Sequence, residues 1–162
     1  MGLDMYLKKR TYLGAQYDFN QITGMIDIQR KNRPVNINFK RITHIEEEVG
    51  YWRKANAVHK WFVDNIQNGE DDCKDYYVDV EELKRLREMI QTILKAKGKE
   101  RENLALKLLP PCDGFFFGNT DVDKYYFEDL EDTVNIINKV ESETEEANEN
   151  NIPVEWVYQS SW

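Results

Sequence analysis

Hydrophobic and polar residues alternate in four short segments of the chain, residues 3–9, 24–30, 35–39 and 154–158. A period of two is typical of β-strands that bury one face. The second and third segments flank a Lys31-Asn32-Arg33-Pro34 break, which predicts a hairpin. We expect the first and last segments to pair, so that the C-terminal strand completes the sheet that the N-terminal strand begins.

Apolar residues at helical spacing predict three helices, over residues 44–67, 80–97 and 124–140. Each run follows a residue type that caps helix N-termini. These capping residues are Thr43, Asp79 and either Asp121 or Asp123. We expect Gly50 to loosen or break the first helix and Asn68-Gly69 to end it.

The segments between these elements are less regular. Residues 76–78 and 115–117 predict two further short strands, and residues 99–103 form a charged linker. Residues 104–109 are too short and apolar to separate a helix from a buried strand. Residues 141–151 are acidic and rich in amides, which fits either the solvated end of the third helix or a mobile loop.

These elements together predict one domain over residues 1–162 with an α+β fold. Its sheet is mostly antiparallel and contains the N-terminal strand, the hairpin and the C-terminal strand. About three helices pack with this sheet. The chain has 162 residues, enough for one domain with a proper core but not for two domains of ordinary size.

Composition narrows the classes of function. Hydrophobic residues make up 41% of the chain and the net charge is −8, as in a soluble globular protein. The negative charge disfavours direct nucleic-acid binding unless basic residues cluster. No apolar run suits a membrane span or a signal peptide. The two cysteines, Cys73 and Cys112, lack CxxC spacing and indicate a reducing compartment, so we expect a cytoplasmic protein.

The first predicted helix carries most of the candidate chemistry. A helical wheel places Trp52, Asn56 and His59 beside the apolar arc, with Arg53 off this arc, where it could bind an anion at the rim. His59 is either a core histidine satisfied by one hydrogen bond, the more common role, or a functional imidazole. Trp61 falls on the opposite face, where it either binds a partner or is covered by another segment.

Aromatic residues elsewhere could complete a ligand site. Phe115 and Phe117 lie between glycines, where a ring can closely approach a planar ligand, although packing is the more common role. Rings stack on bases and arginine pairs with phosphate, which predicts a site for a small anionic, nucleotide-like molecule. The predicted ligand-binding residues are Tyr6, Trp52, Arg53, Asn56, His59, Phe115 and Phe117.

Metal and catalytic motifs are weak. Asn119, Asp121 and Asp123 begin like a calcium loop, but Lys124 and Leu130 stand where this loop needs Gly and Glu. The His and Cys residues lack the paired spacing of a zinc site. We assign no metal, cofactor or catalytic residue. A small hydrolase that uses His59 as its base ranks below two binding hypotheses given below, because no nucleophile motif accompanies this residue.

Several motifs resemble an uncharacterised family of small phage and prophage-encoded proteins. They are Met1-Gly2-Leu3-Asp4-Met5-Tyr6-Leu7, Gly50-Tyr51-Trp52-Arg53-Lys54-Ala55-Asn56, His59-Lys60-Trp61-Phe62, Leu108-Leu109-Pro110, Gly114-Phe115-Phe116-Phe117-Gly118, Tyr125-Tyr126-Phe127-Glu128-Asp129-Leu130 and Gln159-Ser160-Ser161-Trp162. The resemblance spans nearly the whole chain. It implies a phage accessory role in the host cytoplasm, such as countering host defence.

Two modes of action follow from this resemblance. In the first, the chain binds and sequesters a nucleotide-like ligand. In the second, its acidic residues mimic nucleic acid on a host protein, although such runs are more often a solvated face. The predicted partner-binding residues are Trp61, Glu141, Glu143, Glu145 and Glu146. We expect neither direct nucleic-acid nor membrane contact, and an oligomer is compatible with the sequence.

Overall fold

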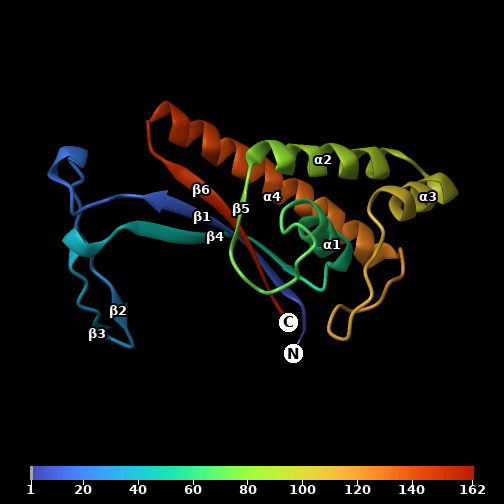
Figure 1. The fold of residues 1–162 in the computed structure, drawn as a ribbon, viewed down its shortest axis with the longest axis horizontal. Coiled ribbons are helices and arrows are strands. Elements are labelled where there is room, and N and C mark those ends of the chain that lie inside the picture. The colour runs from blue at the N-terminus through green and yellow to red at the C-terminus, as the bar shows by residue number, and fades with distance from the viewer. Residues whose placement is uncertain (1) are drawn as a thin grey trace.

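The computed structural model describes residues 2–162 and has a four-stranded antiparallel sheet with helices on one face (Figure 1). The strand order is β4-β1-β6-β5. The strands are β1 (Asp4–Tyr12), β4 (His44–Arg53), β5 (Tyr76–Val78) and β6 (Val154–Ser161). The helices are α1 (Asn56–Asn65), α2 (Val80–Lys95), α3 (Gly98–Leu108) and α4 (Lys124–Glu149). The predicted α+β class with an antiparallel sheet is confirmed.

The core lies between the sheet and the helices. Leu3, Met5 and Leu7 of β1 are fully buried on this helix-covered face, as their alternation predicted. Helix α4 runs along the same face: its Thr133 accepts a hydrogen bond from Trp52 of β4 at 2.9 Å. Figure 1 shows α2 beside α4 in this layer. No helix covers the other face of the sheet, which we call the open face. It carries Lys8 and Arg10 of β1, whereas Lys9 points toward α4.

Strands β1 and β6 pair directly, as the sequence predicted, from Asp4 opposite Ser161 to Thr11 opposite Val154. The short strand at residues 76–78 is also confirmed and pairs with β6 at the edge of the sheet. Asp79 caps α2 by accepting a hydrogen bond from the Glu81 backbone N–H at 2.9 Å. These elements form where the local pattern and the tertiary packing agree.

The helix predicted over residues 44–67 is wrong in its first half. Residues 44–53 form β4, which pairs with β1 along its whole length, and only Asn56–Asn65 is helical. The sheet favours this because Glu46 meets Arg10 across the strands, with 2.6 Å between Nε and Oε2. The capping-box signal at residues 43–46 is therefore overridden by pairing with a distant strand.

Two other segments, residues 99–103 and 115–117, differ from the sequence-based expectation, and the structure decides two segments that the sequence left open. The charged linker at residues 99–103 belongs to α3, which also decides residues 104–108 in favour of helix, so there are four α-helices instead of about three. Residues 115–117 form a turn instead of a strand, because the Phe117 N–H donates to the Gly114 carbonyl at 3.0 Å. The acidic residues 141–149 are the end of α4, the first of the two alternatives for this segment.

The predicted hairpin forms only at its tip. Strands β2 (Gln29–Arg30) and β3 (Arg33–Pro34) make a separate two-stranded sheet. The turn residues Lys31 and Asn32 have φ of 51° and 58°, as a type I′ turn requires. We call residues 13–43 the arm. The arm projects from the far ends of β1 and β4, away from both chain termini (Figure 1). No helix within residues 2–162 is sufficiently long and apolar to cross a membrane.

Candidate functional site

His59 lies inside the protein, at the end of the sheet where the two termini meet. Its side chain is 1% exposed, and both ring nitrogens have partners. Nε2 lies 2.9 Å from Asp71 Oδ2, and Nδ1 lies 2.8 Å from the Tyr158 hydroxyl. Because a carboxylate only accepts, Nε2 donates to Asp71, and the Tyr158 hydroxyl is the partner of Nδ1. Burial raises the pKa of Tyr158, which keeps its hydroxyl protonated.

Trp162 and Phe117 complete the cluster around His59. Asp71 also accepts from Trp162 Nε1 at 3.0 Å, and the Phe117 ring packs edge-on against the imidazole at 5.0 Å between centroids. The structure thus places His59 as the satisfied core histidine, one of its two predicted roles. Both ring nitrogens are therefore already bound to groups of the protein.

Asn56 fixes the loop that follows α3. Its Nδ2 donates to the carbonyls of Phe117 at 3.0 Å and Asn119 at 2.7 Å. Its Oδ1 accepts from the Cys112 backbone N–H at 3.2 Å. The side chain is 6% exposed and three of its four hydrogen-bonding positions are used within the protein. Asn56 therefore holds the Phe115–Phe117 turn against α1.

Trp52 and Arg53 point to opposite sides of β4. The helical wheel placed them on one helix, but successive strand residues alternate between the faces of a sheet. Trp52 is 3% exposed and donates to Thr133 in the core, whereas Arg53 is exposed on the open face. Trp61 is 6% exposed, so the alternative in which another segment covers this residue is the correct one.

Arg53 belongs to a group that we call the terminal surface, defined as Tyr6, Tyr51, Arg53, Lys54 and Phe115. Tyr6 is half-buried and the other four residues are exposed. Tyr6 and Tyr51 are cross-strand neighbours with ring centroids 5.5 Å apart, and Arg53 lies opposite Asp4 in the same register. The Leu3 backbone donates to Phe116 and accepts from Lys54, at 3.1 and 2.8 Å, which brings the Phe115 turn to this end of the sheet. Phe115 is 95% exposed.

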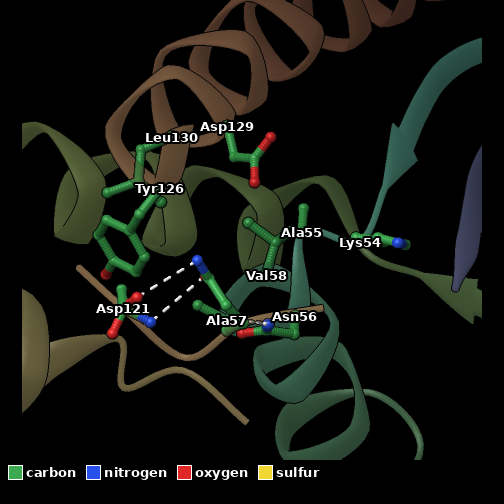
Figure 2. A pocket seen from close by; sticks show the side chains of 10 residues that line it. Lys54, Ala55, Asn56, Ala57, Val58, Asp121, Tyr126, Asp129 and Leu130 are labelled. Carbon is green, nitrogen blue, oxygen red and sulfur yellow. Dashed lines mark hydrogen bonds between the residues drawn. The ribbon is translucent and has the colours of Figure 1, made fainter. Parts of the chain in front are cut away.

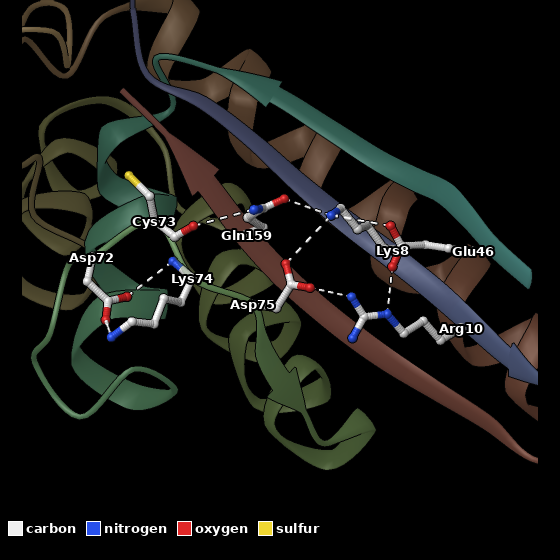
Figure 3. Close-up of polar contacts among 8 residues, drawn as sticks. All are labelled: Lys8, Arg10, Glu46, Asp72, Cys73, Lys74, Asp75 and Gln159. Carbon is white, nitrogen blue, oxygen red and sulfur yellow. Dashed lines mark hydrogen bonds and ion pairs between the residues drawn. The ribbon is translucent and has the colours of Figure 1, made fainter. Parts of the chain in front are cut away.

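The cations of the open face divide into two groups. Lys8 and Arg10 are used within the protein: Lys8 Nζ lies 2.7 Å from Gln159 Oε1, and both cations pair with Glu46 and Asp75 (Figure 3). Burial disfavours the charge of Arg10, but its hydrogen bonds to the two carboxylates outweigh this effect and raise its pKa. These contacts neutralise the middle of the open face.

Arg53 and Lys54 form the second group, because neither makes an ion pair within residues 2–162. Lys54 also has a left-handed backbone with φ of 61°, which turns the chain from β4 into α1. The terminal surface thus carries two exposed cations without ion-pair partners in the described part of the chain, next to Tyr6 and Tyr51 and at the same end of the sheet as the Phe115 turn.

A small cavity lies behind Lys54, between α4 and the first turn of α1 (Figure 2). Its volume is about 40 Å³, room for a few water molecules, whereas sites for small ligands usually span ~300–1,000 Å³. Asp129 faces this cavity, and burial followed by repulsion from Asp132, Asp123 and Glu128 raises its pKa to about 6. This cavity is therefore too small for a nucleotide-sized ligand.

The four predicted partner-binding glutamates of α4 have unequal surroundings. Glu143 lies 2.9 Å from Lys9 Nζ, and this hydrogen bond raises the pKa of Lys9. Glu141 forms an ion pair with Arg87. Only Glu145 and Glu146 are exposed. Two of the four carboxylates are thus committed to internal contacts.

No group of three or more acidic, His or Cys side chains within residues 2–162 is arranged to bind a metal.

Several residues of this region had no recognisable sequence signal. Asp71 and Trp162 contact each other across 91 positions of the chain, and Tyr158 reaches His59 across 99. Tyr51 joins Tyr6 only because residues 44–53 form a strand. An alternating pattern was the sole signal that could have found Tyr51, and three consecutive glutamates obscure it.

Comparison with protein-family models, curated proteins and solved structures gave no significant match.

Proposed function

We propose that this chain is a non-catalytic binding protein whose terminal surface binds an anionic, nucleotide-like ligand. The observation that carries the proposal is the pair of exposed cations, Arg53 and Lys54, without carboxylate partners among the described residues, beside exposed aromatic rings. A guanidinium donates two parallel hydrogen bonds to a phosphate, and an exposed ring offers a face to a base.

The rings differ in what they offer to a ligand. Phe115 is nearly fully exposed, and its neighbour Phe116 packs edge-on against it at 4.8 Å between centroids, which supports the ring from one side. The Tyr51 hydroxyl donates to Asp4 at 2.5 Å, which holds the Tyr51 ring beside Tyr6. The Tyr51 ring is therefore oriented before a ligand arrives, which reduces the entropy lost on binding.

The buried cluster below this surface has a supporting role in the proposal. Asn56 holds the turn that carries Phe115, and His59 packs beneath Phe117. A ligand on the surface would contact neither side chain directly. The resemblance to phage accessory proteins suggests why such binding would matter: capture of a host nucleotide signal lowers its free concentration without any catalytic turnover.

The proposal is tested by calorimetric titration of the full chain with cyclic dinucleotides, ADP and ADP-ribose. We compare wild type with Arg53→Gln/Lys54→Asn, in which Asn tolerates the left-handed backbone at position 54. The matched control is Lys95→Gln/Lys97→Asn, which removes two exposed cations outside the terminal surface. We expect binding to wild type and the control, and at least a tenfold loss in the first variant.

A further variant separates stacking from charge. Phe115→Ala removes an exposed ring without disturbing the core, and we expect it to weaken binding of ADP more than binding of inorganic pyrophosphate, which has no base. Absence of nucleotide binding to wild type at about 1 mM ligand, or equal losses in the two double variants, would refute the proposal.

A further inference from the structure

The arm exposes apolar side chains that nothing in the same chain covers. Ala15 is its only buried hydrophobic residue, and none of its large apolar residues belongs to the core. Its most exposed hydrophobic residues are Phe19 at 79% and Met25 at 95%, and Ile28, Val35 and Ile37 are each more than 40% exposed. A two-stranded ribbon has little stability alone, and an apolar surface of this kind usually marks an interaction site.

The arm also differs from the rest of the chain in charge. It contains five Lys or Arg residues and two Asp residues, a net charge of +3, so the other residues together carry −11. Lys40 pairs with Asp18 at 2.8 Å. Arg30, Lys31, Arg33 and Arg41 make no ion pair with any described residue. Three of these four free cations lie at the tip of the hairpin.

We propose that the arm docks on the acidic body of a second copy of this chain, and that two copies exchange arms in a symmetric dimer. Two arms facing each other would bring like charges together, whereas an arm facing a body brings +3 toward −11. Nucleic acid would attract the arm but would be repelled by the much larger charge of the body. Exposed aliphatic side chains also require an apolar surface on the partner.

The body offers a groove that fits such an arm. It has a volume of about 610 Å³ and lies between edge strand β5, the start of α2 and the turn from α4 to β6. Ile152, Pro153 and Val154 supply apolar lining, and Tyr77 beside them is 66% exposed. Asp79 and Glu155 also line the groove, and neither forms an ion pair within the described chain.

The backbone of the groove can take part as well. β5 is the edge strand of the sheet and has only β6 as a neighbour, so one side of β5 is free to pair with an extended segment. In the arm, residues 35–38 belong to no helix or strand, and the Val35 N–H donates to the Ile28 carbonyl at 2.7 Å. This segment could lie along β5 with its apolar side chains in the groove.

The positions of arm and groove suit reciprocal exchange. The Tyr12 N–H, at the base of the arm, donates to the Pro153 carbonyl in the groove lining at 3.1 Å. Both elements therefore lie at the same end of the protein. A two-fold axis near this end would let each arm reach the groove of the other copy, which gives a closed dimer instead of a filament.

The dimer is tested by sedimentation velocity with charge-reversal variants of the full chain. The arm variant is Arg30→Glu/Lys31→Asp/Arg33→Glu, and the groove variant is Asp79→Asn/Glu155→Lys. Asn at position 79 keeps the helix cap. We expect wild type to dimerise at concentrations up to about 100 µM and each variant alone to be monomeric. Far-ultraviolet circular dichroism checks that both variants remain folded.

An equimolar mixture of the two variants gives the decisive result. The acidic arm of one then faces the basic groove of the other, and the unchanged arm faces the unchanged groove, so both contacts are complementary and the dimer should return. A monomeric wild type, or a mixture that stays monomeric, would overturn the proposal. Binding of a duplex DNA probe by monomeric wild type, abolished in the arm variant, would assign the arm to nucleic acid instead. The terminal surface takes no part in these experiments, so they test the dimer separately from nucleotide binding.

Discussion

The imidazole of His59 and the hydroxyl of Tyr158 share a buried hydrogen bond of 2.8 Å that joins α1 to β6. The Tyr158 ring also stacks on Phe62 at 3.8 Å between centroids, so this one residue links the helix to the sheet by both polar and apolar contacts. The contact closes the core at the end that carries the terminal surface. Because the Phe117 ring also packs against His59, this hydrogen bond lies beside the turn that carries Phe115.

Removal of the Tyr158 hydroxyl should destabilise the protein. Tyr158→Phe keeps the ring but leaves Nδ1 of His59 buried without a partner, which should lower the free energy of unfolding by about 1–3 kcal/mol. Urea denaturation at pH 7 measures this change. Tyr77→Phe is the matched control, since Tyr77 is 66% exposed and its hydroxyl has no partner within the described chain. Equal effects of the two substitutions would show that the His59 contact contributes nothing.

The elements that could be predicted from sequence are those whose local pattern agrees with their packing. Strand β1 and strand β6 alternate clearly, and α2 has both its cap and its apolar stripe. Strand β4 was missed because its capping signal and three glutamates favour a helix locally. The residues that hold it in the sheet, among them Arg10, come from a strand more than 30 positions away.

The candidate site could be predicted only in part for the same reason. The inward orientation of His59 was predicted correctly because this residue lies within the true helix α1. A helical wheel does not describe Trp52 and Arg53, because both residues lie in strand β4. The Asp71–His59 and Trp162–Asp71 contacts join loops and a chain end, where no periodicity links one residue to the other.

Loss of the Asn56 amide should loosen the turn that carries Phe115. Asn56→Ala removes three hydrogen bonds to residues 112–119, so backbone amides in this segment should exchange hydrogen at least tenfold faster, since each 1.4 kcal/mol of lost local stability is about a tenfold change. Hydrogen exchange followed by mass spectrometry checks the effect. Asn135→Ala, at an exposed position of α4, is the control. Unchanged exchange in residues 112–119 would contradict this role.

Ionisation of Asp129 should destabilise the folded state. Its pKa is raised to about 6, so the folded protein binds this proton more tightly than the unfolded chain does. The stability from protonated Asp129 is fully present below the unfolded pKa, near 4, and is lost as the pH rises through about 6. We expect Asp129→Asn to raise the free energy of unfolding at pH 7 by about 1 kcal/mol, a value reduced for solvent screening.

The pH dependence distinguishes this effect from a change in packing. At pH 4 the wild-type carboxyl is protonated in the folded protein and resembles the amide, so the stabilisation should disappear there. Urea denaturation at both pH values measures it, with Glu131→Gln on the exposed face of the same helix as the control. A gain that is equal at pH 4 and pH 7 would show that charge is not its cause.

Gly50 should be required for the close packing of β4 on α4. A Cβ built at this position would lie 2.6 Å from Ile136 Cγ2, closer than real side chains approach. Gly50→Ala should therefore lower the free energy of unfolding by about 1–3 kcal/mol through overpacking. Ile136→Ala removes all side-chain atoms of this residue beyond Cβ, including the opposing Cγ2, and should lower stability on its own by leaving a cavity.

In the double variant the new methyl group occupies space that Ile136 has vacated. We expect the double variant to be more stable than the sum of the single effects by at least about 0.5 kcal/mol in a urea-denaturation cycle. If the two single-variant changes in stability simply add, the sheet can move away from α4 without cost. Gly50 would then not determine the distance between the sheet and α4.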